Sequence, residues 1–314
     1  MDIRTLSLKN IITMESTLTT DKEREFYNAI YKFLNEIHNP VCVYHYTDFS
    51  ALKGILIDKG FRLCRTDKMN DKREMINFIE LVEISLKNRF QGDVSVIKKI
   101  DEKFREEKAA RKKDIAYIAS FSACEDDASQ WERYGNNGKG VSVAVDVKIL
   151  KSIVSNRRIS LQETFYGKNA DNHQITDVLE DLFSDNDYVR HGFDKNSFED
   201  AFWQMWILSV AHKHFSFAGE REFRLMTFPQ YRGKRYDKLG EICKEMTPAG
   251  LRECIYWDWK TDCKQNNITY EKLIKELVIG PRAKMSVADL KHWLKENNLE
   301  CLKKCVRKSE SPLV

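Results

Sequence analysis

Apolar residues recur with two different periods along this 314-residue chain, and the two kinds of segment follow one another irregularly. Alternation at every second residue predicts a strand, and recurrence at every third and fourth residue predicts a helix. A regular succession of strand and helix would favour a parallel sheet, whereas an irregular one favours an α+β fold. The sequence therefore predicts a mixed, mostly antiparallel central sheet flanked by helices.

The predicted elements are placed by these periods together with capping and turn residues. Strands are expected at Val41–Thr47, Phe61–Arg65, Asp114–Ala123, Gly140–Asp146, Arg158–Phe165, Glu220–Phe228, Glu276–Gly280 and Leu299–Val306. Helices are expected from Thr20 or Asp21 to His38, and at Ser50–Lys59, Asp71–Phe90, Val94–Lys112, Phe198–Phe217 and Ser286–Asn297. The segment Phe198–Phe217 is apolar around most of its circumference, which is typical of a buried helix.

No repeat or Pro/Ser-rich linker divides the chain, so the expected organisation is a helical segment at 1–39, a single α+β domain at 40–308 and a tail at 309–314. The 17 Phe, 12 Tyr and 6 Trp exclude disorder as the main state. The formal charge of 52 − 48 = +4 selects no partner. No run approaches the roughly 18 apolar residues of a membrane span, and the N-terminus has no signal-peptide pattern, so a cytoplasmic protein without a membrane partner is expected.

The eight cysteines contain no CxxC pair and are expected to be reduced, half-buried side chains. A zinc site would need Cys243, Cys254 and Cys263 with Cys301 or Cys305, without the usual knuckle spacing, and no metal is expected. The chain also lacks GxGxxG, GxxxxGK[ST], HExxH and GxSxG, which argues against Rossmann and P-loop nucleotide sites and against the metalloprotease and hydrolase templates.

Polar residues stand at the end of the first predicted strand. His45 and Thr47 share one strand face with Val41 and Val43 because side chains alternate with period two. A His and a Thr at a strand end are a usual ligand-binding pair, and a core His bonded to backbone is the alternative.

Two further segments carry polar residues that a plain structural element does not need. Ser120 and Ser122 close a strand, and Trp131 and Tyr134 follow at helical spacing, which suits stacking on a planar ring or anchoring of the helix to the sheet. Alternation also places Glu220, Glu222 and Arg224 on one strand face, either as an exposed salt-bridged strand or as the lining of a cleft.

The ordered motifs resemble the bacterial domain-of-unknown-function family 2971. The similar segments, which together span about 40–308, are Tyr44–Thr47, Met69–Glu74, Phe121–Ser122, Trp131–Gly135, Gly138–Val141, His212–His214, Glu220–Arg224 and Ile279–Pro281.

A more distant resemblance is to ADP-ribosyltransferase-like domains, above all the DNA-modifying toxins. It rests on the strand with His-x-Thr, the turn Gly60–Leu63, the Ser-x-Ser at Ser120–Ser122 and the Glu-x-Glu at Glu220–Glu222. The resemblance implies NAD as a substrate. It assigns His45 to the adenosine ribose with Thr47 nearby, Ser122 to the site wall, Trp131 or Tyr134 to nicotinamide, and Glu222 to the nicotinamide ribose and the transition state. Ser120, Glu220 and Arg224 complete the expected NAD-binding set.

The leading hypothesis is thus an NAD-consuming ADP-ribosyltransferase or glycohydrolase, acting as a toxin or phage-defence effector on a protein, a nucleic acid or water. The chain mixes two motif types, since His-type enzymes use a Tyr where Ser-x-Ser stands here, and Tyr117 points to the strand face opposite Ser122. A non-catalytic ligand-sensing or protein-interaction module is the alternative. A metal-dependent nuclease with Asp126, Asp127, Glu220 and Glu222 as ligands is a third hypothesis.

Overall fold

The computed structural model describes residues 40–68, 74–154, 159–167, 195–231, 234–235, 242–247 and 250–313, with Ile175, Leu179, Phe183 and Val189 as single residues. The helix predicted to end at His38, the segment 1–39 and Val314 lie outside the described residues. Within them, no helix combines the length and the apolarity that a membrane span requires.

Ten strands of the described part of the chain join in one sheet, with the path β11-β12-β2-β3-β1-β4-β13-β14 and with β5 and β8 attached through β3. All of its pairings are antiparallel except β13 with β14. The strands of this sheet are β1 Cys42–Thr47, β2 Phe61–Arg65, β3 Tyr117–Ser122, β4 Val141–Asp146, β5 Ile159–Glu163, β8 Glu222–Thr227, β11 Cys243–Thr247, β12 Gly250–Trp257, β13 Ile274–Ile279 and β14 Val306–Lys308. The expected mixed, mostly antiparallel sheet is confirmed.

Among the described residues, two small pairs of strands lie outside this sheet, namely β6 Phe165–Gly167 with β7 His212–His214 and β9 Gln230–Tyr231 with β10 Lys234–Arg235. The α-helices are α3 Phe49–Lys53, α4 Glu74–Arg89, α5 Val94–Ala110, α6 Ala128–Arg133, α7 Val147–Val154, α10 Lys195–Val210, α11 Trp259–Gln265, α12 Tyr270–Leu273 and α13 Val287–Glu296. Tighter or wider helical turns are η2 Gly54–Asp58, η3 Thr66–Lys68, η4 Arg111–Lys113, η5 Phe215–Glu220 and η7 Glu300–Cys305.

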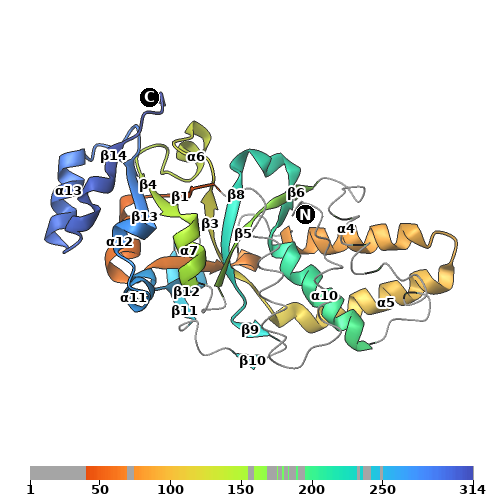
Figure 1. Ribbon diagram of the computed structural model, residues 1–314. Coiled ribbons are helices and arrows are strands. Elements are labelled where there is room, and N and C mark those ends of the chain that lie inside the picture. The colour runs from red at the N-terminus through yellow and green to blue at the C-terminus, as the bar shows by residue number, and fades with distance from the viewer. Residues whose placement is uncertain are drawn as a thin grey trace, which may run out of the picture.

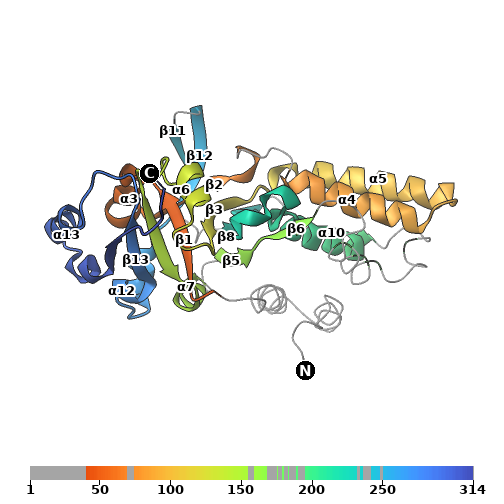
Figure 2. The same cartoon turned by 90° about the horizontal axis from the view of Figure 1, so that it is seen from above.

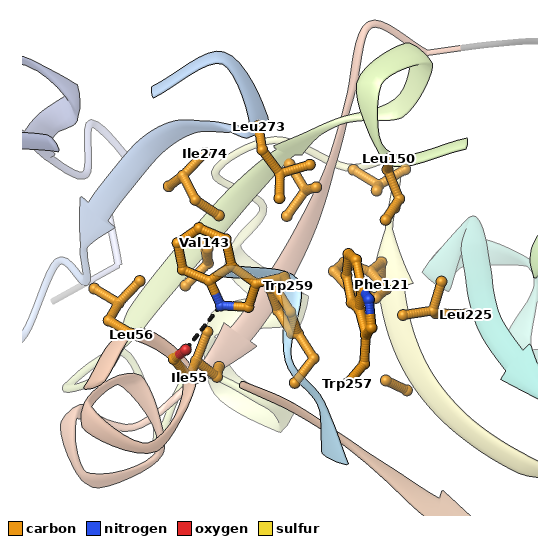
Figure 3. Packing of buried hydrophobic residues seen from close by; sticks show 14 of the residues in the cluster. Ile55, Leu56, Phe121, Val143, Leu150, Leu225, Trp257, Trp259, Leu273 and Ile274 are labelled. Carbon is orange, nitrogen blue, oxygen red and sulfur yellow. Dashed lines mark hydrogen bonds between the residues drawn. The ribbon is translucent and has the colours of Figure 1, made fainter. Parts of the chain in front are cut away.

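The buried apolar residues of the described part form two large cores and a smaller cluster around Tyr44, Tyr46 and Trp131. One core contains Val43, Phe61, Phe121 and Leu225 from the strands together with Trp257 and Trp259. Figure 3 shows Phe121 and Leu225 beside Trp257 in this core. The indole Nε1 of Trp259 donates to the carbonyl of Ile55 at 2.8 Å. The other core joins α4, α5 and α10, which lie together at one end of the molecule (Figures 1 and 2), to the sheet residues Ile118 and Met226.

The middle of the sheet is split at β3. Strand β8 pairs with β3 over its whole length, from Tyr117↔Thr227 to Ser122↔Glu222. On the other edge of β3, β2 pairs only with its first two residues and β1 only with Ser122. Strands β1 and β2 therefore diverge along that edge, and residues 119–121 of β3 lie between them.

Two predicted elements differ from the structure, one in where it ends and one in its type. The helix predicted over Phe198–Phe217 ends at Val210. His212–His214 instead forms strand β7, which pairs with β6 in a register that places Phe165 opposite His212. The strand predicted over Leu299–Val306 is the helical turn η7, and only Val306–Lys308 extends beside β13.

The hairpin of β11 and β12 had no counterpart among the predicted strands. It stands out from the body of the molecule in Figure 2, and Met246 and Leu251 on it are exposed. Because few apolar residues of this hairpin enter a core, its apolar pattern is weak.

Candidate functional site

A cavity of about 970 Å³ opens over the split in the sheet. Its floor consists of side chains that share one sheet face, because residues directly opposite each other in a sheet point to the same side. Ser120 faces Arg224 and Ser122 faces Glu222 across β3 and β8, and Arg62 faces Tyr256 across β2 and β12. The walls come from α3, α6 and η5, which contribute Asp48, Ser50, Ala51, Gln130, Tyr134, Phe217 and Glu220.

Eight of the nine residues predicted from the sequence to form the site line this cavity: His45, Thr47, Ser120, Ser122, Tyr134, Glu220, Glu222 and Arg224. They come from four separate stretches of the chain, which the split sheet brings together. The exposed salt-bridged strand, the alternative for Glu220 to Arg224, is wrong, because Glu220, Glu222 and Arg224 are all buried.

His45 lies at the boundary between the cavity and the first core. Its ring contacts those of Phe61 and Phe121, with centroids 5.8 and 5.3 Å away, and its Nδ1 lies 2.8 Å from the carbonyl oxygen of Ser120. A carbonyl only accepts, so Nδ1 carries the proton, and Nε2 of the neutral ring is an acceptor. Burial lowers the pKa of His45, although the Ser120 hydrogen bond opposes this effect. The ring thus makes the backbone bond of a core histidine and also lines the cavity.

Glu222 is held by donors on every side. Its Oε1 accepts from Ser120 Oγ at 2.5 Å and Arg224 Nε at 3.1 Å, and its Oε2 accepts from Arg224 Nη2 and Lys213 Nζ, both at 3.1 Å. Burial alone would raise the pKa of this carboxyl, but the charges of Arg224 and Lys213 and the hydrogen bonds from Arg224 and Ser120 lower it to about 2. Glu222 is therefore an ionised carboxylate at neutral pH.

Glu220 precedes the strand and still joins the same cluster. It lies in η5, and the left-handed Arg221, with φ 41°, leads the chain into β8. Its Oε1 accepts from Tyr134 Oη at 2.8 Å, and its Oε2 accepts from Lys213 Nζ at 2.8 Å. Burial and the hydrogen bond that Tyr134 donates to Glu220 raise the pKa of Tyr134 to about 12. Lys213 therefore bridges the two glutamates.

Lys213 was missed by the sequence analysis, which placed His212–Lys213–His214 on a helix. Because side chains alternate along strand β7, Lys213 points to the face opposite that of His212 and His214, and it reaches both glutamates. His212 is fully buried between Phe78 and Phe165. Arg62, Asp48 and Tyr256, which also line the cavity, were missed as well. Asp48 and Tyr256 belong to no motif, and Arg62 lies in the turn Gly60–Leu63 without a role assigned to it, so only the tertiary structure places all three at the cavity.

Ser122 has a different role from Ser120. Its hydroxyl donates to the carbonyl oxygen of Glu220 at 2.7 Å and accepts from the backbone N–H of Cys124 at 3.0 Å. Ser122 thus fixes the approach of η5 to β3.

Trp131 does not reach the cavity. It is fully buried, its indole Nε1 donates to Asp126 Oδ1 at 2.7 Å, and its ring meets that of Tyr46 edge-on at 4.9 Å. Trp131 therefore anchors α6 to the sheet, whereas Tyr134 lines the cavity and is 43% exposed.

The acidic residues considered for a nuclease are not gathered in one place. Glu220 and Glu222 lie in the cavity, whereas Asp126 is bonded to Trp131 and Ser309, and Asp127 caps α6. Among the described residues, no group of three or more His, Cys, Asp or Glu side chains is arranged to hold a metal ion. The metal-dependent nuclease therefore has no supporting geometry.

Comparison with known proteins gives one match. Residues 130–225 match a family model described as a protein of unknown function (DUF2971). No curated protein and no solved structure matches the chain. The matched stretch runs from α6 to β8 and contains Tyr134, Glu220, Glu222 and Arg224, whereas His45 and Ser120 lie before it. Over these residues the match confirms the resemblance drawn from the motifs, and this part of the chain is similar to that family.

Proposed function

We propose that the cavity binds NAD and breaks its nicotinamide–ribose bond. The observation that carries this proposal is the ionised carboxylate of Glu222 on the cavity floor, linked through Ser120 to His45. Breaking the bond builds positive charge on the ribose, and a fixed carboxylate stabilises that charge without reorganisation. The cavity is large enough for a dinucleotide.

The other lining residues suit the remaining parts of NAD. Tyr134 offers a half-exposed ring for a planar base, and Arg62 offers a guanidinium for the pyrophosphate. Nicotinamide leaves as a neutral molecule, an acceptor H–X attacks the anomeric carbon, and the products are ADP-ribosyl-X, nicotinamide and a proton. The acceptor X is a side chain of a protein, a base of a nucleic acid, or the hydroxyl of water.

A test combines the full chain with NAD labelled in its adenosine half, with and without cell extract and nucleic acid, and measures nicotinamide release and label transfer. We expect Glu222→Gln to lower the rate by about 100- to 1,000-fold. Glu132→Gln is the matched control, because Glu132 is exposed on α6 and outside the cavity lining. The proposal fails if the wild type shows neither product under any of these conditions.

One feature favours a second function for the same cavity, that of a non-catalytic ligand sensor. The carboxylate of Glu222 already accepts four hydrogen bonds, two of them from Arg224, so a ligand hydroxyl must displace a donor to reach it. In that case NAD or another ligand binds, calorimetry detects it, and no nicotinamide appears.

An effector that consumes NAD would stop the growth of its host. Induced expression of the wild type is then expected to lower cellular NAD before growth stops, and Glu222→Gln at an equal protein level is expected to do neither. Growth arrest with unchanged NAD, in both strains, would instead support the sensor or interaction module.

A further inference from the structure

Three cysteines lie in a row across the sheet beside the cavity. Cys243 on β11 faces Cys254 on β12, and Cys254 faces Cys64 on β2. Because directly opposite residues share a face, all three thiols lie on the sheet face that bears the cavity, and Cys64 belongs to its lining. The eight cysteines, all in the described part of the chain, are thiols.

The hydrogen-bond pattern of the sheet distinguishes the two cysteine pairs. The N–H of Thr66 donates to the carbonyl of Ala116 at 3.0 Å, so the backbone groups of Thr66 point toward β3. Those of Cys64, two residues earlier and opposite Ile118, point the same way. Ile118 and Ser120 are two residues apart on β3, so their backbone groups point to the same edge of that strand. The Ser120 carbonyl, which accepts from His45 on β1, lies at this edge.

Since Cys64 directs its backbone groups to β3, it makes no ladder bond with Cys254 on its other side. Cys64 and Cys254 are thus a non-hydrogen-bonded pair, with Cα atoms about 4.5 Å apart, and Cys254 and Cys243 are the wider pair, at about 5.5 Å. Disulfides span Cα distances of about 4.4–6.8 Å, and side chains approach more closely in non-hydrogen-bonded pairs. Cys64 and Cys254 are therefore the better placed to join.

The two thiols differ in access. Cys64 is half-buried and belongs to the cavity lining, whereas Cys254 is not among the lining residues. Cys254 is 1% exposed, and burial together with the neighbouring Glu245 and Cys64 raises its pKa to about 11. Cys64 is accordingly the thiol that reacts first, and Cys254 is the one that resolves.

We propose that Cys64 and Cys254 form a redox-active dithiol site that takes small disulfides through the cavity. The Cys64 thiol loses its proton, and its thiolate attacks a disulfide G–S–S–G, which forms Cys64–S–S–G and releases G–S⁻, which takes up that proton as G–SH. The Cys254 thiol then loses its proton and attacks the sulfur of Cys64, which forms the Cys64–Cys254 disulfide and releases the second G–SH. The two protein thiols are oxidised, and one small disulfide is reduced to two thiols. The closed bond joins the floor of the cavity at β2 to the hairpin of β12.

The site is tested on the native full chain with oxidised glutathione as the probe, followed by acid quenching, alkylation and tryptic digestion. Each cysteine of the row lies in its own tryptic peptide: 63–65, 253–260 and 239–244. The expected product is peptide 63–65 linked to peptide 253–260, with a mass two hydrogens below the sum of the two. The reading is made on the wild type, so it does not depend on whether a variant folds.

Two variants sharpen the test. Cys64→Ser is expected to abolish the linked peptide and to leave Cys254 unmodified by glutathione, whereas Cys301→Ser, at an exposed cysteine far along the chain, is expected to leave the link unchanged. The proposal is overturned if Cys254 links only to Cys243, or if Cys301 takes up glutathione while no peptide links Cys64 to Cys254. Nicotinamide release plays no part in this readout, so failure here and failure of the proposed function are separate results.

Discussion

Glu222 is an ion buried among ions of opposite charge. Its partners Arg224 and Lys213 are themselves buried, and Arg224 Nη1 donates to the carbonyl of Val210 at 2.5 Å. Such a group costs desolvation free energy that its hydrogen bonds must offset, and removal of one partner leaves an uncompensated charge. A chain retains this arrangement where a charge is needed at a fixed position, which is what the proposed reaction requires.

The depressed pKa of Glu222 predicts how stability depends on acid. An unfolded glutamate has a pKa of about 4.3, so the ionised form stabilises the fold above that pH, and this contribution is lost as pH falls toward the folded value of about 2. Glu222→Gln is expected to show a shallower loss of the free energy of unfolding between about pH 5 and 3. Urea titrations, monitored by tryptophan fluorescence, measure the free energy of unfolding at each pH. Glu132→Gln should keep the wild-type slope, and equal slopes for the wild type and Glu222→Gln would contradict the expectation.

The two serines of β3 are predicted to respond differently to loss of their hydroxyls. Ser120→Ala removes a donor to Glu222. It is expected to lower the rate of nicotinamide release by a larger factor than it lowers the equilibrium constant for folding. Ser122→Ala leaves the buried carbonyl of Glu220 and the N–H of Cys124 without that hydroxyl, and is expected to cost about 1–3 kcal/mol of unfolding free energy. The rate of nicotinamide release and the free energy of unfolding are measured in both variants. A larger loss of stability in Ser120→Ala and a larger loss of rate in Ser122→Ala would show that the roles are exchanged.

At the scale of elements, α6 is held in place from the C-terminal segment. Asp126 stands before α6 in the left-handed region, with φ 48°, and accepts from Trp131, from Ser309 Oγ at 2.5 Å and from the N–H of Glu310 at 2.6 Å. Strand β14 leads directly into Ser309, so the segment after β14 positions the helix whose end carries Tyr134.

Loss of the Asp126 carboxylate is therefore expected to destabilise the fold by about 2–3 kcal/mol in Asp126→Ala, because the buried indole N–H of Trp131 loses its acceptor. Asp126→Asn keeps an acceptor and tolerates the left-handed backbone, so its cost is expected to be smaller. Chemical denaturation measures both. Glu125→Gln removes the charge of a half-exposed pair with Arg307 and keeps a side-chain oxygen for the hydrogen bond with Tyr44, so it is expected to stay within about 1 kcal/mol of the wild type. Equal costs for the three variants would refute this role of Asp126.

The sequence was informative about elements with a strong period and much less so about where they end. Strands Phe61–Arg65 and Val41–Thr47 and the helix Ser286–Asn297 were predicted almost to the residue, because alternation or the cap at Ser286 marks them. The predicted helix over Phe198–Phe217 ran seven residues too far because its apolar character continues through Ala211, while the pairing of β7 with β6 ends it. That pairing is a tertiary contact, and propensity does not encode it.

At the scale of the whole molecule, the site exists because strands β1 and β2 diverge from one edge of β3. Motifs indicated eight residues of the lining, but not Lys213, whose contacts depend on β7, nor the burial of Trp131. Local patterns identify residues of the right chemistry, and the divergence of two strands decides which of them meet.

A ligand in this cavity touches both edges of the split and therefore stabilises the sheet as a whole. NAD at about 100 times its dissociation constant is expected to add about 2.7 kcal/mol to the free energy of unfolding and to raise the thermal midpoint. Differential scanning calorimetry measures the shift. Arg62→Ala, at a half-exposed lining residue, is expected to reduce the shift with little change in the midpoint of the ligand-free protein. No shift at saturating NAD would contradict binding of NAD in this cavity.

Proton NMR of NAD mixed with the full chain follows binding and bond breaking in one sample, since the anomeric proton beside nicotinamide disappears as free nicotinamide appears. With the wild type and an acceptor mixture of cell extract and nucleic acid, we expect free nicotinamide to accumulate, and with Glu222→Gln at least 100-fold more slowly. An unchanged NAD spectrum with the wild type, or equal rates for the two proteins, would contradict cleavage of NAD at Glu222.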